Sequence, residues 1–125
     1  MEKWRVLLVD DEEEFVLTLA ERLNLRGIHA TVATDGESAL RLIEGDPPDV
    51  VVLDVLMPGM SGLDVLQRIR QEYPQIRVIL LTGHGSTRDG IEGMRLGAFD
   101  FLMKPLSIEK LVEKLRNATG STSST

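Results

Sequence analysis

The chain of 125 residues is long enough for one domain with an ordinary hydrophobic core and too short for two of typical size. It contains no Cys, which excludes disulfides, thiol catalysis and Cys-based metal sites and is typical of a reducing compartment such as the cytoplasm. The net charge of −6, with basic residues scattered along the chain, argues against direct binding of nucleic acid. The apolar runs are short, so we expect no membrane-spanning segment.

Five short apolar runs predict five strands. Four are rich in aliphatic residues and lack polar alternation, which is typical of strands buried on both faces of a parallel sheet. They lie at 6–9, 50–53, 78–81 and, with a weaker pattern, 101–103. The run at 30–33 includes Thr31 and follows Gly27, and we expect it at an edge of the sheet.

Helices are predicted between and after these strands. Residues that can cap a first helical turn mark their beginnings: Asp35, Ser61, Ser86 and Ser107. Two segments repeat apolar residues at the spacing of one helix face, Val16, Leu19, Ala20 and Leu23 in one and Ile108, Leu111, Val112 and Leu115 in the other. Because strands and helices alternate, the sequence predicts an α/β fold with a five-stranded parallel sheet and helices on both faces.

The residues that end the predicted strands can carry chemistry. Asp10 and Asp11 follow the first strand, Asp54 the third, Thr82 the fourth and Lys104 the fifth. Ligand sites of open parallel sheets lie beyond this edge, so we expect these side chains to converge there. Two carboxylates about 4 Å apart, at an effective dielectric of roughly 20, repel by up to ~4 kcal/mol, and a cation is needed among them. Oxygen ligands without His or Cys favour Mg²⁺.

Asp54 is the residue best placed to act as a nucleophile. A carboxylate can accept a phosphoryl group to form an acyl phosphate. Lys104 would then supply a positive charge, and Thr82 a hydroxyl donor, to the oxygens of the transferring group. The strand ends therefore predict phosphoryl transfer to Asp54.

Four motifs carry these residues. They are Val9-Asp10-Asp11, Leu53-Asp54 followed by Met57-Pro58-Gly59-Met60-Ser61-Gly62, Leu81-Thr82-Gly83, and Gly97-Ala98-Phe99-Asp100-Phe101-Leu102-Met103-Lys104-Pro105. Together they resemble the response-regulator receiver domains of bacterial two-component signalling. The resemblance leads us to expect a receiver domain over 1–118 and, at 119–125, a disordered tail or the start of a linker.

The resemblance implies the flavodoxin-like strand order 2-1-3-4-5 and a phosphorylation-controlled switch. Asp54 would accept its phosphoryl group from a phosphohistidine of a sensor histidine kinase or phosphotransfer protein. Mg²⁺ would be bound by Asp11, Asp54 and the backbone carbonyl of Leu56, with Asp10 acting largely through water. We expect an effector domain beyond the C-terminus as the output, and no contact of the receiver itself with nucleic acid or membrane.

The resemblance also implies roles around the phosphoryl group. Thr82 and Lys104 would hold its oxygens, and the Lys104–Pro105 peptide bond is expected to be cis. Leu56 and His84 would line the approach of the water that removes the group. Such a protein is no enzyme in the usual sense, since it catalyses only its own phosphoryl uptake and loss.

Thr82 and Phe101 form the switch that the resemblance implies. The Thr82 hydroxyl would follow the phosphoryl group, and the Phe101 ring would turn inward behind it. This movement would change the face made by the fourth helix, the fifth strand and the fifth helix. Phe101 stands where many receivers have Tyr, so no phenolic hydroxyl takes part.

Three other functions compete with the switch. A phosphatase with an aspartyl-phosphate intermediate needs a general acid two residues beyond its nucleophile, where this chain has Leu56. A nucleotide-binding module needs glycines after the first strand, where this chain has Asp10-Asp11-Glu12. The alternative that stays open is a phosphorylation-independent docking module, although the loss of Asp54, Lys104 or an acidic residue that would mark it is not seen.

Overall fold

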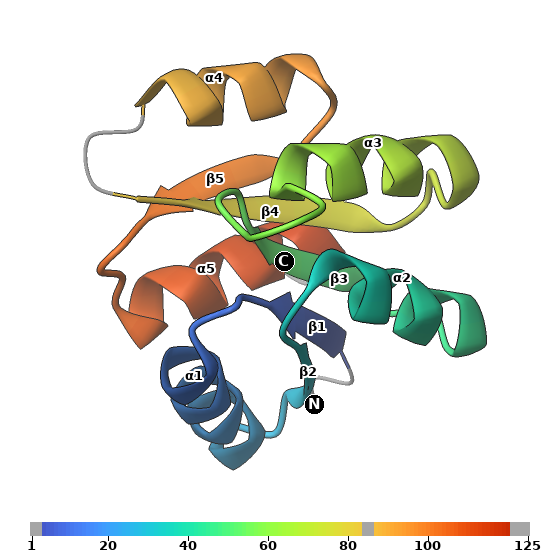
Figure 1. Cartoon of the computed structure of the whole chain (residues 1–125). Coiled ribbons are helices and arrows are strands. Elements are labelled where there is room, and N and C mark those ends of the chain that lie inside the picture. Colours follow the sequence, from blue (N-terminus) through green and yellow to red (C-terminus); the bar gives the residue numbers. More distant parts are fainter. Residues whose placement is uncertain (1–3, 84–86, 121–125) are drawn as a thin grey trace.

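One parallel sheet with helices on both faces makes up the fold. The structure, a computed structural model, describes residues 4–83 and 87–120. The strand order is β2-β1-β3-β4-β5, and every pairing is parallel, as predicted (Figure 1). The elements in chain order are β1 (Arg5–Val9), α1 (Glu13–Leu25), β2 (His29–Ala33), α2 (Gly36–Gly45), β3 (Val50–Asp54), α3 (Gly62–Glu72), β4 (Arg77–Thr82), α4 (Thr87–Arg95), β5 (Asp100–Met103) and α5 (Ile108–Thr119).

Each strand contains the apolar run that predicted it and extends slightly beyond it. β3 ends at Asp54 and β4 at Thr82, one residue later than the runs suggest. Both polar residues therefore continue the ladder and lie at the carboxyl edge of the sheet. β2 pairs only with β1 and exposes His29 and Thr31, which confirms it as an edge strand.

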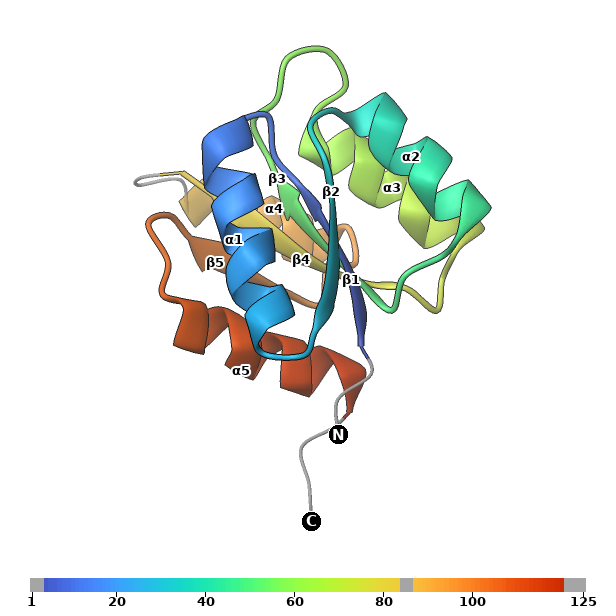
Figure 2. The same ribbon diagram turned by 90° about the horizontal axis from the view of Figure 1, so that it is seen from below.

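Alternate residues of the central strands face opposite sides and build two apolar layers. On one side α1 and α5 lie next to each other against the sheet (Figure 2). On the other side lie α2, α3 and α4 (Figure 1). The stripes predicted on the first and last helices are buried in the first layer: Val16, Leu19, Ala20, Leu23, Ile108, Leu111, Val112 and Leu115.

Three of the predicted N-caps are confirmed by hydrogen bonds. The Asp35 carboxylate accepts from the backbone N–H of Ser38 at 2.7 Å. The Ser61 and Ser107 hydroxyl oxygens accept in the same way from the backbone N–H three residues later, at 3.2 and 3.1 Å. The fourth predicted cap, Ser86, lies outside the described residues.

The last helix ends one residue beyond the expected limit of the domain. α5 includes Thr119, and Gly120 caps it with a φ of +74°, in the left-handed region that glycine adopts readily. Residues 121–125 lie outside the described part of the chain. Among the described helices, none combines the length and the apolar character that crossing a bilayer requires.

A close backbone contact fixes the loop that follows β3. The Gly62 N–H donates to the Val55 carbonyl oxygen at 2.9 Å. A Cβ atom at Gly62 would lie 2.1 Å from the carbonyl oxygen of Asp54, so only glycine fits there without displacing the backbone. The start of α3 is thereby held against the end of β3, where Asp54 sits.

The substitution Gly62→Ala should lower the free energy of unfolding by about 1–3 kcal/mol, because the added methyl group overpacks this contact. Gly45→Ala is the matched control, since it changes a helical glycine whose Cβ would meet nothing within 4 Å. It should raise stability by up to ~1 kcal/mol through helix propensity. Urea unfolding of the two variants measures both effects, and similar values would contradict the close contact.

Candidate functional site

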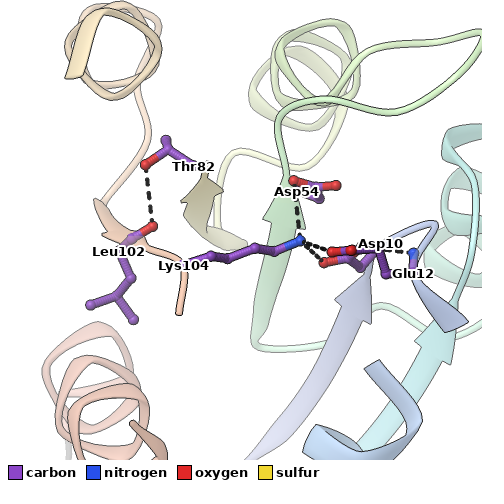
Figure 3. A network of polar contacts seen from close by, with 6 residues as sticks. All are labelled: Asp10, Glu12, Asp54, Thr82, Leu102 and Lys104. Carbon is purple, nitrogen blue, oxygen red and sulfur yellow. Dashed lines mark hydrogen bonds and ion pairs between the residues drawn. The ribbon is translucent and has the colours of Figure 1, made fainter. Parts of the chain in front are cut away.

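Side chains from four strand ends meet at the carboxyl edge of the sheet. Asp10 follows β1, Asp54 ends β3, Thr82 ends β4 and Lys104 follows β5. Lys104 reaches across this edge toward the two carboxylates (Figure 3). Asp10, Asp54 and Thr82 are buried, so the charges of both acids are largely removed from water.

Three acidic side chains form a cluster suited to a cation. Asp10, Asp11 and Asp54 each offer a carboxylate oxygen, and these oxygens lie within 4.8 Å of one another. Two of the acids are buried and Asp11 is exposed, so the cluster opens to solvent on one side. Hard oxygen donors in an open cluster suit a divalent ion such as Mg²⁺, which keeps several of its waters.

Lys104 supplies the positive charge within the cluster. Its ammonium nitrogen lies 2.7 Å from Asp10 Oδ2, 2.7 Å from Glu12 Oε1 and 3.8 Å from Asp54 Oδ1 (Figure 3). It also lies 4.7 Å from the centre of the Phe15 ring, within the range of a cation–π contact. Burial alone would lower the pKa of Lys104, but the bonds to Asp10 and Glu12 outweigh it and raise that pKa.

Glu12 and Phe15 are site residues that the sequence patterns did not single out. Glu12 directly follows the acidic pair, and that adjacency was the one available signal. Its backbone N–H donates to Asp10 Oδ1 at 2.9 Å, and its carboxylate turns to Lys104, whose ammonium holds the pKa of Glu12 below its usual value. The two partners are 92 positions apart in the chain, so the pairing depends on how the folded chain brings the start of α1 to the residue that follows β5.

The Asp54 carboxyl is electrostatically strained. Burial raises its pKa to about 7, and the charges of Asp10 and Asp11 add to the rise. Lys104 and a backbone hydrogen bond from Leu56 act in the opposite direction. A further cation in the cluster would lower this pKa and favour the ionised, nucleophilic form of Asp54.

Thr82 and Phe101 lie on the neighbouring strands β4 and β5, where Thr82 pairs with Met103 and Phe101 with Leu80. The Thr82 hydroxyl donates to the Leu102 carbonyl oxygen at 3.5 Å, a long contact that points away from Asp54 (Figure 3). The half-buried Phe101 ring lies beneath α4, where a Cβ atom at Gly90 would come within 2.8 Å of it. One turn later, a Cβ atom at Gly93 would lie 1.9 Å from the Leu80 side chain.

The other predicted site residues are placed as follows. The Lys104–Pro105 peptide bond is cis. Leu56 follows the end of β3, and its side chain is exposed beside the acidic cluster. His84 lies outside the described residues.

Comparison with known proteins gives a consistent result. The family model for the response regulator receiver domain matches residues 6–116. The probable transcriptional regulatory protein TcrX of Mycobacterium tuberculosis is 45% identical over 111 residues, which cover 89% of this chain and 47% of that protein. The transcriptional regulatory protein CpxR of Escherichia coli K12 is 44% identical over 112 residues, covering 90% of this chain and 47% of CpxR. The chain thus spans about half the length of these curated relatives.

Solved structures agree with this assignment. The receiver domain of NtrX from Brucella abortus superposes with a TM-score of 0.88 at 31% identity, covering 94% of this chain and 99% of the other. The receiver domain of the Francisella response regulator 1452 also gives 0.88, at 34% identity, covering 97% and 100%. The chain therefore belongs to the receiver domains of response regulators, the phosphorylation-controlled switches of two-component systems.

Proposed function

We propose that Asp54 is the phosphoryl acceptor of this receiver and that Mg²⁺ is required for the transfer. The observation that carries the proposal is the placement of the buried Asp54 within the acidic cluster, 3.8 Å from the Lys104 ammonium. The donor would be a phosphohistidine on a sensor histidine kinase or phosphotransfer protein. In the transfer a P–O bond forms at an Asp54 carboxylate oxygen while the P–N bond breaks, and the imidazole nitrogen leaves with the bonding electrons.

The acidic cluster supports the metal requirement. Asp10, Asp11 and Asp54, with the backbone carbonyl of Leu56, would hold Mg²⁺, Asp10 partly through water. The bound ion would offset the negative charge that gathers on the carboxylates and on the transferring oxygens. Lys104 would supply a second positive charge, and Thr82 a hydroxyl donor.

Loss of the phosphoryl group follows from the same site. Water would attack phosphorus, and the Asp54 carboxylate would leave. Leu56, whose side chain is exposed, and His84 would line the approach of this water. The chain would thus catalyse its own phosphorylation and dephosphorylation without acting on a separate substrate.

The signal is proposed to leave through α4, β5 and α5. A phosphoryl oxygen on Asp54 would draw the Thr82 hydroxyl away from the Leu102 carbonyl oxygen, a bond that is already long at 3.5 Å. The space behind Thr82 would then admit the Phe101 ring, which is half-buried beneath α4. Phosphorylation would shift the population of these two arrangements.

The output of the whole protein is proposed by analogy with its relatives. TcrX and CpxR are named as transcriptional regulators and are about twice as long as the matched region. An effector domain following this receiver would fit that pattern, and any contact with nucleic acid would then belong to the effector domain. We expect the phosphoryl transfer to take place in the cytoplasm, where histidine kinases have access to ATP.

Incubation with acetyl phosphate and Mg²⁺ should add one phosphoryl group to the protein, as read by intact-mass spectrometry. Asp54→Asn should abolish the addition, because an amide is not a comparable nucleophile. Asp64→Asn, at an exposed acid of α3, should leave it unchanged. An addition that survives Asp54→Asn would move the acceptor elsewhere, and an unmodified parent protein would favour the docking module.

In the absence of divalent cations, Asp54 should make stability fall as pH rises. The folded state holds the Asp54 proton up to a pKa of about 7, whereas the unfolded chain releases it near 3.8. Stability is therefore lost as the pH rises between these values. Above pH 8, the free energy of unfolding of Asp54→Asn should exceed that of the parent by about 2–4 kcal/mol. Urea unfolding across this pH range, with a chelator present, measures the difference.

Mg²⁺ bound at the acidic cluster should stabilise the fold at the pH where Asp54 is ionised. Mg²⁺ at about a hundred times its dissociation constant should raise the stability of the parent at pH 8 by ~2.7 kcal/mol. The gain should shrink at pH 5.5 and in Asp11→Ala. A gain that is independent of pH and of Asp11 would place the metal outside the acidic cluster.

Thr82→Ala should still be phosphorylated but should transmit less of the change to α4. Amide chemical shifts of Thr87–Arg95 should respond to beryllofluoride in the parent and much less in this variant. Thr82→Ser keeps the hydroxyl and should preserve most of the response. Equal responses in all three proteins would exclude the relay through Thr82 and Phe101.

A further inference from the structure

Lys104 is engaged on its α1 side before any phosphoryl group arrives. Its nitrogen is 2.7 Å from Glu12 Oε1 but 3.8 Å from the nearer oxygen of Asp54, the residue beside which it is proposed to act. The Phe15 ring, in the first turn of α1, contacts the same nitrogen. The start of α1, together with Asp10 at 2.7 Å, thus holds the ammonium away from direct hydrogen bonding to Asp54.

Glu12 differs from the other two carboxylates that pair with Lys104. Asp10 and Asp54 belong to the acidic cluster, so a bound divalent ion would offset their charge. Glu12 is not a member of that cluster, and its side chain is 64% exposed. Among the carboxylates paired with Lys104 in the described structure, Glu12 is therefore the one that would still compete for the ammonium once the metal is bound.

The local backbone keeps Glu12 available for this pairing. Its N–H donates to Asp10 Oδ1 at 2.9 Å, which ties the residue to the end of β1. Glu12 occupies the N-cap position of α1, yet its side chain makes no capping hydrogen bond. The carboxylate is directed to Lys104 instead, as Figure 3 shows.

We infer that Glu12 is a positioning residue that holds Lys104 toward α1 and competes with the phosphoryl group for it. The inference rests on the proposed role of Asp54 and Lys104. Binding of a phosphoryl group requires the Lys104 ammonium to exchange the Glu12 carboxylate for a phosphoryl oxygen. The Glu12–Lys104 pair thus favours the unphosphorylated state and lowers the affinity of the site for the phosphoryl group.

The affinity for beryllofluoride at saturating Mg²⁺ tests this competition. Glu12→Gln keeps the size of the side chain and removes its charge, so the affinity should rise about two- to fivefold, the range of a partly exposed ion pair. Glu13→Gln is the matched control, because it removes the same charge one residue later from a side chain that is not paired with Lys104. The rise should be clearly larger for Glu12→Gln, as measured by titration followed by NMR.

Two further measurements separate the ion pair from general charge effects. Glu12→Asp keeps the charge but shortens the reach, and it should also raise the affinity. The difference between the parent and Glu12→Gln should shrink in 1 M salt, since exposed pairs are screened there at a Debye length of about 3 Å.

The possible results divide clearly. Equal affinities of Glu12→Gln and Glu13→Gln, or a lower affinity of Glu12→Gln, would overturn the competition while leaving the proposed function intact. If beryllofluoride binds neither the parent nor the Glu12 variants, the proposed function fails as well. This inference alone is refuted if beryllofluoride binds the parent, Asp54→Asn abolishes that binding, and Glu12→Gln and Glu13→Gln bind with equal affinity.

Discussion

The ion pairs of the Lys104 ammonium are the interaction on which the site depends. Parallel strands bring their carboxyl ends to one edge, and here that edge buries the acids Asp10 and Asp54. Two buried negative charges without a partner would destabilise the fold or take up protons. Lys104 offsets them from a position that follows the last strand, so the first and last parts of the sheet must be correctly assembled before the acids are balanced.

The same burial has two opposite effects on the chemistry of Asp54. Removal from water makes the free carboxylate costly, which is why its pKa rises to about 7. If the oxygen carried a phosphoryl group, as proposed, the same burial would limit the access of water to the acyl phosphate. In the proposed function, a cation would therefore favour the ionised, nucleophilic Asp54, and the burial of Asp54 would slow the loss of the phosphoryl group afterwards.

Sequence patterns predicted the fold well because its local signals agree with one another. The aliphatic runs, the caps at Asp35, Ser61 and Ser107, and the stripes of the first and last helices each describe short-range structure. The meeting of Asp10, Asp54 and Lys104 followed from one rule, that parallel strands end at the same edge. The strand order itself came from the family resemblance rather than from periodicity.

The pairings within the site could not be predicted in this way. Whether Lys104 turns to Asp54 or to Glu12 depends on side-chain rotamers and on where α1 begins, and neither has a periodic signature. The direction of the Thr82 hydroxyl, toward Leu102, likewise depends on the exact distance between β4 and β5. Patterns locate such residues at an edge, but contacts of 3 to 4 Å are decided by packing.

The two glycines of α4 determine how this helix can move. Helices usually pack with side-chain ridges in the grooves of their neighbours, and sliding then requires each ridge to climb out. At Gly90 and Gly93 the backbone of α4 itself lies against Phe101 and Leu80, so no ridge interlocks there. A shear motion of α4 across the sheet would therefore meet no interlocked side chain of its own at these two positions, and at Gly90 it would have to pass the Phe101 ring.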